Sequence, residues 1–375
     1  MDACDVLIVG AGPAGSSCSW GLRQRGFDVA IMDKRVFPRD KTCGGWITPA
    51  VLSELQIDPL EYARKHVFQP ITGFRTSIIG GSEVQTGYGR PISYGIRRFE
   101  FDEFLLRRCG ARVVEGVPLA SLERSGDAWI VNGQIKARLV VGAGGHFCPV
   151  ARHLGANARN ETAVAAQEIE FEMTAGQRER CSIREEVPEL YFCPDMKGYG
   201  WCFRKKNFLN IGLGRLDPHS FPSHVSAFAQ FLSASGKLSF ALPSSMSGHA
   251  YLLFRESNRR LLDDGILLVG DAAGLAYSQS GEGILPAIES GLLAAEAIVA
   301  ADGNYSAGKL ERYRDLLHAR FGKSGKDFSI AIGSHLPDGL VSVLARVLLA
   351  SAWFSRHVIL DRWFLHRNGP ALSTR

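Results

Sequence analysis

The sequence lacks the cysteine and histidine patterns that a disulfide framework or a metal site would need. It has eight cysteines, but no CxxC pair occurs and residues 203–375 contain none. Its ten histidines show neither an HxxxH spacing nor a His/Cys cluster. Because disulfide-rich folds and zinc sites depend on clustered cysteines, we expect reduced thiols, an intracellular chain and no bound metal.

Long apolar runs and an excess of one charge are also missing. No window approaches the ~18 uninterrupted apolar residues of a transmembrane helix, and the first apolar run starts at Val6 without the pattern of a secretory signal. The net charge of +5 is small and spread along the chain, so it indicates no nucleic-acid surface. We therefore expect a cytoplasmic protein that binds no nucleic acid.

The residues that are present have the composition of a large globular fold. Of the 375 residues, 46% are hydrophobic and 22% are charged. This balance excludes a disordered chain, a collagen-like fibre and a coiled coil. The length fits one large domain or two intertwined ones.

A glycine-rich turn near the N-terminus follows a predicted strand and opens a predicted helix. Residues 5–10 (DVLIVG) form an apolar run of strand length, and Gly10-Ala11-Gly12-Pro13-Ala14-Gly15 leads into a helix expected through Arg25. A second strand is expected over Phe27–Met32, closing on Asp33. A GxGxxG motif in this strand–helix–strand setting, with an acid after the second strand, is the dinucleotide-binding fingerprint.

Each residue type in the fingerprint has a physical role. Gly10 allows the tight turn, Gly12 lets the backbone approach a pyrophosphate, and Gly15 lets the helix pack on the strand. The helix N-terminus offers free N–H groups to the phosphates, and the acid accepts hydrogen bonds from ribose hydroxyls. The cofactor-binding residues predicted in this stretch are Gly10, Gly12, Pro13, Ala14, Gly15, Asp33 and Lys34.

A second stretch indicates which dinucleotide binds. In residues 265–291, a buried-strand run ends in Gly270-Asp271, and Gly281-Glu282-Gly283 opens a helix expected to about Ala301. This stretch resembles the FAD-dependent oxidoreductases similar to p-hydroxybenzoate hydroxylase. The resemblance implies that Asp271 holds the ribityl chain of FAD, and that Gly270, Gly281, Gly283 and Ile284 belong to the same site. It also implies a helix N-terminus that stabilises negative charge on the reduced flavin.

Arg98 is a third match to that superfamily. It lies in Arg97-Arg98-Phe99-Glu100-Phe101-Asp102, whose RxxFD spacing resembles the position where an arginine reaches the FAD. The alternative is that both arginines lie at a solvated helix start.

Within the superfamily, the chain resembles geranylgeranyl reductases and their relatives. Cys43-Gly44-Gly45 matches their Cys-Gly-Gly turn, and GDAAGL…GEGI matches their form of the second FAD motif. Residues 197–203 (KGYGWCF), followed by Lys205 and Asn210-Ile211-Gly212-Leu213-Gly214, resemble their YxWxFPK…NxGxG hairpin. The resemblance implies a reductase with a long apolar cavity beside the flavin.

Cys43 is the predicted catalytic residue. On a glycine-rich turn beside a flavin, a thiol could lie over the ring, donate a proton or form a redox contact. Cys43, Gly44 and Gly45 are therefore also predicted to contact the cofactor. The alternative is a small buried hydrophobe, which is the interpretation we adopt for the other seven cysteines.

The chain departs from its relatives in ways that bear on the electron donor. Ser278 and Arg204 stand where family members often have proline, and residues 142–147 (GAGGHF) lack the aspartate of the superfamily's GADG stretch. That aspartate is associated with the nicotinamide cofactor, so direct use of NAD(P)H stays open. A ferredoxin-like or flavin electron-donor protein is the alternative.

Three aromatic residues alternate along a predicted strand. Tyr199, Trp201 and Phe203 should point to one face because the side-chain period of a strand is two. The family resemblance makes this face a wall of the substrate cavity, and we predict all three as substrate-binding residues. Packing between two domains is the alternative.

The predicted fold class is α/β. We expect a Rossmann-like FAD-binding domain of the GR2 type with a parallel sheet, an inserted antiparallel-sheet substrate domain and C-terminal helices. In residues 160–260, Glu168, Glu170 and Glu172 alternate with apolar neighbours as in a half-buried strand. The predicted divisions are 1–70, 95–158 and 262–310 for the FAD domain, 71–94 and 159–261 for the substrate domain, and 311–375 for the helices.

The segment 340–365 (LVSVLARVLLASAWFSRHVILDRWFL) is unusually apolar and aromatic, with arginines interspersed. It is too interrupted to span a bilayer. It could cap a lipid cavity, lie on the inner membrane face as a peripheral contact, or pack on the core.

Three functions stay open on the sequence. The first is an FAD-dependent reductase of C=C bonds in an isoprenoid or other long apolar substrate, by hydride transfer from reduced flavin. The second is an NAD(P)H/FAD-dependent aromatic or polyketide monooxygenase. The third is a flavoprotein that only carries electrons or senses redox state. No general acid stands out in the motifs, so the proton source is open.

Overall fold

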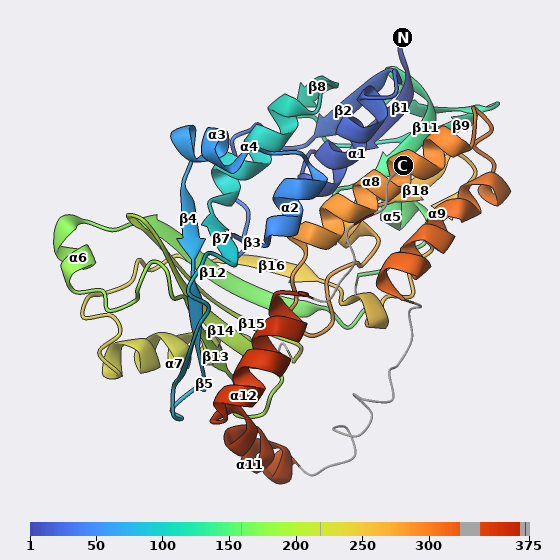
Figure 1. The fold of residues 1–375 in the computed structure, drawn as a ribbon. Coiled ribbons are helices and arrows are strands. Elements are labelled where there is room, and N and C mark those ends of the chain that lie inside the picture. The colour runs from blue at the N-terminus through green and yellow to red at the C-terminus, as the bar shows by residue number, and fades with distance from the viewer. Residues whose placement is uncertain (159, 218, 323–337, 368–371, 373–375) are drawn as a thin grey trace.

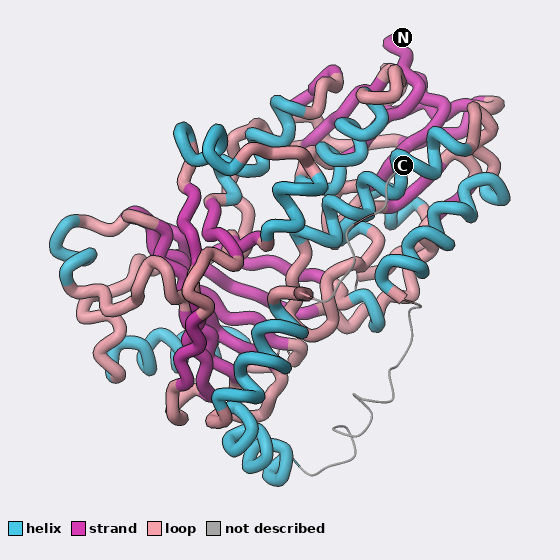
Figure 2. Tube along the Cα trace, viewed as in Figure 1, coloured by secondary structure: helices cyan, strands magenta, loops and turns pink. Residues whose placement is uncertain are grey.

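The computed structural model describes residues 1–158, 160–217, 219–322, 338–367 and 372, and its strands gather in two large layers (Figures 1 and 2). One layer is near the N-terminus and is covered by helices. The other is the long twisted sheet in the lower half of Figure 1.

The first sheet has the order β17-β18-β11-β1-β2-β8, in which every pair but the antiparallel β17–β18 is parallel, and the β9–β10 hairpin extends it from β11. Val6, Leu7 and Ile8 in β1 are fully buried, as expected of a parallel strand covered on both faces. Its strands are β1 (Asp2–Val9), β2 (Val29–Asp33), β8 (Arg112–Glu115), β9 (Leu122–Ser125), β10 (Ala128–Val131), β11 (Ile135–Gly142), β17 (Leu262–Asp263) and β18 (Ile266–Leu268).

Helices α1 (Pro13–Arg23) and α8 (Ile284–Ala300) cross in close contact on this sheet. A Cβ atom added at Gly291 would lie 2.4 Å from the carbonyl oxygen of Ala14, so only glycine fits at the crossing. Both helices end slightly earlier than the sequence suggested. The other helices of this part are α2 (Pro49–Glu54), α3 (Pro59–Lys65), α4 (Arg98–Arg108), α5 (Pro149–His153) and α9 (Ala307–Phe321).

The second sheet has the order β16-β12-β15-β14-β13-β5-β6, and only its β13–β5 pair is parallel. Its strands are β5 (Gly73–Ile78), β6 (Val84–Gly87), β12 (Val164–Glu172), β13 (Glu189–Phe192), β14 (Gly198–Lys205), β15 (Phe208–Arg215) and β16 (Ser247–Tyr251). Helices α6 (Ala175–Glu179) and α7 (Phe221–Ala234) belong to the same part of the chain. A small antiparallel sheet, β3 (Trp46–Ile47), β7 (Ser93–Ile96) and β4 (Phe68–Ile71), lies between the two large ones.

The predicted α/β fold class is confirmed, because a parallel Rossmann-like sheet, a mainly antiparallel sheet and C-terminal helices are all present. Strands of the first sheet come from residues 2–142 and 262–268, and those of the second from 73–87 and 164–251. The exact domain boundaries stay a prediction.

The C-terminal helices pack against the second sheet beside β5 (Figure 1). They are α11 (Asp338–Leu349), α12 (Ala352–Phe354) and a π-type helix, Ser355–Phe364. Leu349, Ile359, Leu360 and Phe364 are buried in one apolar cluster with Phe74. Among the described residues no single helix is long and apolar enough to cross a membrane, and Val343–Leu349 with Ala352–Phe364 meets that test only as a pair bent by 79°.

Candidate functional site

A cavity of about 630 Å³ is lined by residues of both large sheets. From the first sheet it receives the loops that follow β1, β2, β11 and β18, all at the carboxyl ends of parallel strands, where doubly wound folds bind their ligands. From the second sheet it receives side chains of β12, β13, β14 and β16, and Phe364 reaches it from the C-terminal helix.

The glycine-rich turn after β1 leaves room for a phosphate group. A Cβ added at Gly12 would meet only the Nη2 atom of Arg39, at 3.5 Å. Helix α1 begins there without a side-chain cap, so its first N–H groups are free for a ligand. The Nη1 atom of Arg39 is buried at the cavity without a hydrogen-bond partner among the described residues. Open space, free N–H groups and a guanidinium nitrogen without a described partner together fit a pyrophosphate.

Three glycines of the two FAD motifs, Gly10, Gly15 and Gly270, shape the backbone and do not line the cavity. Gly10 has φ +114°, and a Cβ there would lie 2.3 Å from the carbonyl oxygen of Ala143. A Cβ at Gly15 would lie 2.0 Å from the carbonyl oxygen of Gly10. Gly270 has φ +59° and packs against Ala14. Their replacement would deform the chain whether or not a ligand is bound.

Asp33 closes β2 at the cavity wall, with Lys34 beside it. Its Oδ2 atom accepts a hydrogen bond from the Ala11 N–H at 2.8 Å, and its Oδ1 atom accepts one from the Arg35 N–H at 2.9 Å. These two bonds fix the carboxylate and leave further lone pairs for ribose hydroxyls.

Arg98 lies at the start of α4 and is buried, contrary to the alternative of a solvated helix start. Its Nε and Nη2 atoms bind Asp102 at 2.6 and 2.7 Å, and Arg39 approaches the same carboxylate at 3.1 Å. Burial disfavours the charge of Arg98, but Asp102 outweighs it and raises the pKa of Arg98. Burial alone would raise the pKa of Asp102, yet the two arginines lower it. Arg98 also lines the cavity.

Asp271 forms a polar cluster with two residues that the sequence did not single out. The Nε2 atom of His249 lies 3.2 Å from Asp271 Oδ2 and 2.7 Å from Lys41 Nζ. Burial lowers the pKa of Lys41 to about 8, against the opposing pull of Asp271. Burial would raise the pKa of Asp271, but His249 and Lys41 bring it down to about 2. The cluster therefore presents one carboxylate and two nitrogen donors or acceptors to the cavity.

The loop before α8 brings Gly281, Gly283 and Ile284 to the cavity wall. Gly281 has φ +67°, and a Cβ there would lie 2.3 Å from the hydroxyl of Tyr251. Helix α8 has no side-chain cap at Gly283, so its positive end is available to an electron-rich group.

Cys43 lines the cavity on the loop after β2, and it is only partly buried. Its Sγ atom accepts a hydrogen bond from the Gly45 N–H at 3.4 Å, and Gly45 has φ +64°. Gly44 lies against the rings of Phe203 and Trp201. The other seven cysteines are buried, which agrees with a packing role, and all eight are free thiols.

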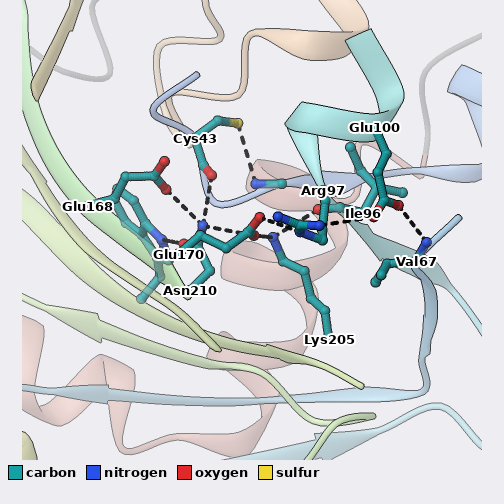
Figure 3. A network of polar contacts seen from close by, with 11 residues as sticks. Cys43, Val67, Ile96, Arg97, Glu100, Glu168, Glu170, Lys205 and Asn210 are labelled. Atoms are coloured by element: carbon teal, nitrogen blue, oxygen red, sulfur yellow. Dashed lines mark hydrogen bonds and ion pairs between the residues drawn. The ribbon is translucent and has the colours of Figure 1, made fainter. Parts of the chain in front are cut away.

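A polar network supports this turn from the second sheet (Figure 3). Asn210 donates from Nδ2 to the Cys43 carbonyl at 3.1 Å and to Glu168 at 2.8 Å, and its Oδ1 atom accepts from Trp201 at 2.8 Å. Glu170 lies next to it and pairs with Lys205 at 2.6 Å.

Simple alternation along β12 would place the carboxylates of this network in solvent. They lie instead inside the protein. Glu168 is 5% exposed, and burial raises its pKa to about 7. Burial acts on Glu170 too, but Lys205 and Arg97 lower its pKa overall. The sequence missed this cluster because alternation cannot tell a solvent-facing strand from one that faces another domain.

Tyr199, Trp201 and Phe203 all line the cavity on β14, on one face as expected. The hydroxyl of Tyr199 donates to the carbonyl of Ser280 at 2.5 Å, which ties the second sheet to the glycine loop before α8. The three rings also belong to the apolar cluster of the second sheet, so they pack between domains and border the cavity at once.

The structure thus brings most of the predicted site residues to one cavity and leaves Gly10, Gly15 and Gly270 behind its wall. Arg39, Lys41, His249 and Glu282 line it as well, although no role was assigned to them. The sequence could have indicated Arg39 and Lys41 as site residues, because both are charged and lie shortly before the Cys-Gly-Gly turn. His249 comes from a distant strand and had none.

Comparisons with known proteins agree with this architecture. Residues 8–66 match the family of NAD(P)-binding Rossmann-like domains. The chain is 29% identical over 324 residues to a menaquinone reductase of Mycobacterium tuberculosis, covering 80% of this chain and 78% of the relative. It is 26% identical over 338 residues to digeranylgeranylglycerophospholipid reductase 1 of Methanothermobacter thermautotrophicus, covering 85% and 83%.

Solved structures share the fold. A geranylgeranyl bacteriochlorophyll reductase-like protein from Thermoplasma acidophilum superposes with a TM-score of 0.77 at 20% identity, covering 98% of both chains. A probable FAD-dependent monooxygenase from Pseudomonas aeruginosa gives a TM-score of 0.65 at 16% identity, covering 96% of this chain and all of that one. The cofactor of this chain is FAD, and the chain is similar to geranylgeranyl reductase-like members of the FAD-dependent oxidoreductase superfamily.

Proposed function

We propose that this enzyme reduces C=C bonds in an isoprenoid or other long apolar substrate. The observation that carries the proposal is the cavity wall opposite the FAD motifs, which consists of Tyr199, Trp201, Phe203, Leu190 and Phe364. An aromatic and aliphatic wall binds a hydrocarbon chain by burying its apolar surface, and it offers few partners to a polar substrate. The named reductases among the relatives support the same reaction class.

Each group of FAD-binding residues proposed for this chain would contact a different part of the cofactor. The free N–H groups of α1, with Arg39, would hold the pyrophosphate, and Asp33 would bind the ribose. Asp271 would bind the ribityl chain, with the α8 loop and the Cys43 turn next to the ring. Bound FAD supplies hydride transfer, which side chains alone do not provide.

The residues of this chain have three further tasks. Cys43 borders the cavity where a substrate double bond would lie. The aromatic wall excludes water from the reacting carbons. The Asn210 network holds the Cys43 turn against the second sheet.

The test is an anaerobic assay of the FAD-loaded protein, reduced with dithionite, against geranylgeranyl lipids and menaquinone with a prenyl tail. The expected product carries two added hydrogens per reduced bond by mass spectrometry. Absence of any such product from a fully reduced enzyme would overturn the proposal.

A monooxygenase acting on an aromatic or polyketide substrate is the second candidate. The fold shared with the Pseudomonas monooxygenase favours it. It predicts that an aromatic compound stimulates aerobic NAD(P)H oxidation and gains one oxygen atom. The reductase predicts neither.

The electron donor belongs to the same proposal. His146 lies in the stretch where the superfamily often has the GADG aspartate. The Nη2 atom of Arg259 donates a hydrogen bond to the His146 carbonyl at 2.9 Å. NAD(P)H, reduced ferredoxin or a reduced flavin, added singly to the oxidised enzyme, should bleach the flavin absorbance in only one case.

We also propose that α11 and α12 contact the inner face of a membrane from the cytoplasm. Val343, Leu344, Val347, Leu348 and Trp353 are exposed, and Arg346 and Arg356 belong to the same segment. Exposed apolar side chains next to cations suit an anionic lipid surface, where a prenyl substrate would reside. Binding to anionic vesicles, lost in a Val347→Asp/Leu348→Asp variant but kept in Leu216→Asp, is the expected result. Equal sedimentation of both variants would overturn it.

A further inference from the structure

Glu282 is a buried acid on a loop that lines the cavity. It lies between Gly281 and Gly283 at the start of α8 and lines the cavity. Its side chain is 4% exposed, and neither carboxyl oxygen has a hydrogen-bond partner among the described residues. An ionised carboxylate in such a place would lose its hydration without compensation, so the group is built to hold a proton.

The loop around Glu282 is held firmly. The Glu282 carbonyl accepts a hydrogen bond from the Tyr277 N–H at 2.9 Å, and its own N–H donates to the Ser280 hydroxyl at 3.3 Å. Tyr199 of the aromatic wall donates to the Ser280 carbonyl. The carboxyl group is therefore fixed between the FAD motif and the predicted substrate wall.

His366 lies behind Glu282, toward the C-terminus. Its Nε2 atom is 3.8 Å from Glu282 Oε2 and has no hydrogen-bond partner in the described part of the chain, and its ring lies tilted against Tyr277 at 3.9 Å between centroids. The His366 side chain is 19% exposed, so it borders both the acid and the solvent. This geometry gives the acid a route to water that does not pass through the cavity.

We infer that Glu282 is the proton donor of the cavity and that His366 returns the proton from solvent. The inference rests on the proposed reductase function. Reduction of a C=C bond adds a hydride, with both electrons, to one carbon, and the reduced cofactor supplies it. The Oε–H bond of Glu282 breaks to give the proton to the other carbon, and its electron pair stays on the carboxylate. Water then reprotonates the carboxylate through His366.

The surrounding charges favour the protonated acid at neutral pH. Burial, then the charge of Glu289, raises the pKa of Glu282 to about 8, against the weaker effect of the nearby Leu285 N–H. The other groups that face this site are His366, Tyr277, Tyr199 and Arg320, of which Arg320 is paired with Glu289. Burial, then Arg320, lowers the pKa of His366 to about 4, so the imidazole is neutral and able to accept a proton.

The first test measures the proton directly and needs no turnover. Infrared spectra of the oxidised, FAD-loaded protein with isotope-labelled glutamate should contain a protonated-carboxyl band at pH 7 that fades above pH 8. Buried Glu168, whose pKa is raised to about 7, should contribute a second component, so Glu282→Gln should remove only the component that persists to pH 8. Glu296→Gln should keep it, because Glu296 lies on the same helix in a surface pair with Arg312. A band that Glu282→Gln leaves unchanged overturns the inference.

The second test separates the inference from the proposed function. In single turnovers of pre-reduced enzyme with a prenyl substrate, Glu282→Gln should slow product formation about 100-fold or more, the usual value of a positioned general acid. Glu282→Asp should recover part of the rate, and the wild-type rate should fall above pH 8. FAD content and melting temperature show whether each variant is folded.

The outcomes are distinct. A wild-type enzyme that reduces no prenyl substrate contradicts the reductase, while the infrared band still reports the buried acid. A wild-type enzyme that works, with a Glu282→Gln variant of equal rate and equal pH profile, contradicts the inference alone.

Discussion

Single residues in this protein owe their roles to what surrounds them. Gly12 has space in front of it, whereas Gly10 and Gly15 have backbone within 2.3 and 2.0 Å of a would-be Cβ. Three glycines of one motif thus have different tasks. One leaves room for a ligand, and the others allow the turn and the helix packing.

Gly12→Val should abolish FAD retention while the chain still folds. The valine would project into the space proposed for the pyrophosphate without striking the backbone. Flavin absorbance after gel filtration measures the loss. Gly308→Ala is the control, because nothing lies within 4 Å of the added methyl group on α9. A yellow, fully loaded Gly12→Val protein would contradict the assignment of this turn to FAD.

Cys43→Ser should lower turnover at least tenfold, which corresponds to about 1.4 kcal/mol of barrier, and leave FAD bound. Its thiol borders the cavity where the reacting bond is proposed to lie. Cys4→Ser, near the start of β1 and outside the cavity lining, should leave turnover unchanged. If the two variants behave alike, Cys43 is only a packing residue. The decline of rate above pH 8 should persist in Cys43→Ser if Glu282 is the donor.

At the scale of elements, the β14–β15 hairpin connects the aromatic wall to the Cys43 turn. The side chain of Asn210 forms hydrogen bonds with the Cys43 carbonyl, with Glu168 of β12 and with the indole of Trp201 on β14 (Figure 3). A side chain with both a donor and an acceptor is needed there, which explains an asparagine on a buried strand.

Asn210→Leu should destabilise the protein by about 2–4 kcal/mol, because the Trp201 N–H and the Glu168 carboxyl lose their partner inside the protein. Urea denaturation of the FAD-loaded protein measures the change. Asn207→Ala in the turn of the same hairpin is the matched control, since that side chain is exposed, and it should stay within about 0.5 kcal/mol of wild type. A similar loss in both variants would show that the network adds no stability of its own.

At the scale of the whole molecule, the cavity exists because two sheets and a C-terminal helix close around it. Phe364 reaches the cavity from the end of the chain, and His366 lies next to a loop of the FAD motif. Joining these parts removes water from Glu282 and Glu168, so the pH dependence of folding reports on the assembled molecule.

The free energy of unfolding should therefore fall with rising pH because of the Glu282 carboxyl group. The folded-state pKa of about 8 lies above the ordinary 4.5, so between these values the folded chain holds a proton that the unfolded chain has released. The favourable contribution is complete below pH 4.5 and is lost by pH 8. Glu282→Gln should gain stability relative to wild type as the pH rises from 5 to 8, measured by urea denaturation. Glu296→Gln should show no such trend, and a pH-independent difference for Glu282→Gln would contradict a buried neutral acid.

The sequence by itself determined the parts that depend on local chemistry. The GxGxxG turn and its flanking strands follow from glycine conformation and apolar periodicity over short windows, and the second FAD motif was found by its resemblance to a known family. The alternation of Tyr199, Trp201 and Phe203 likewise predicted a shared face correctly. Local pattern was sufficient because each of these features is completed within one strand, turn or helix.

Only the tertiary structure decided which distant groups meet. His249 with Lys41 and Asp271, Asn210 with Cys43, and His366 with Glu282 are pairings across elements far apart in the sequence. Periodicity also could not show that Glu168 faces another domain and not water. Burial and charge pairing arise when separate surfaces close on one another, and a linear pattern records each surface but not its partner.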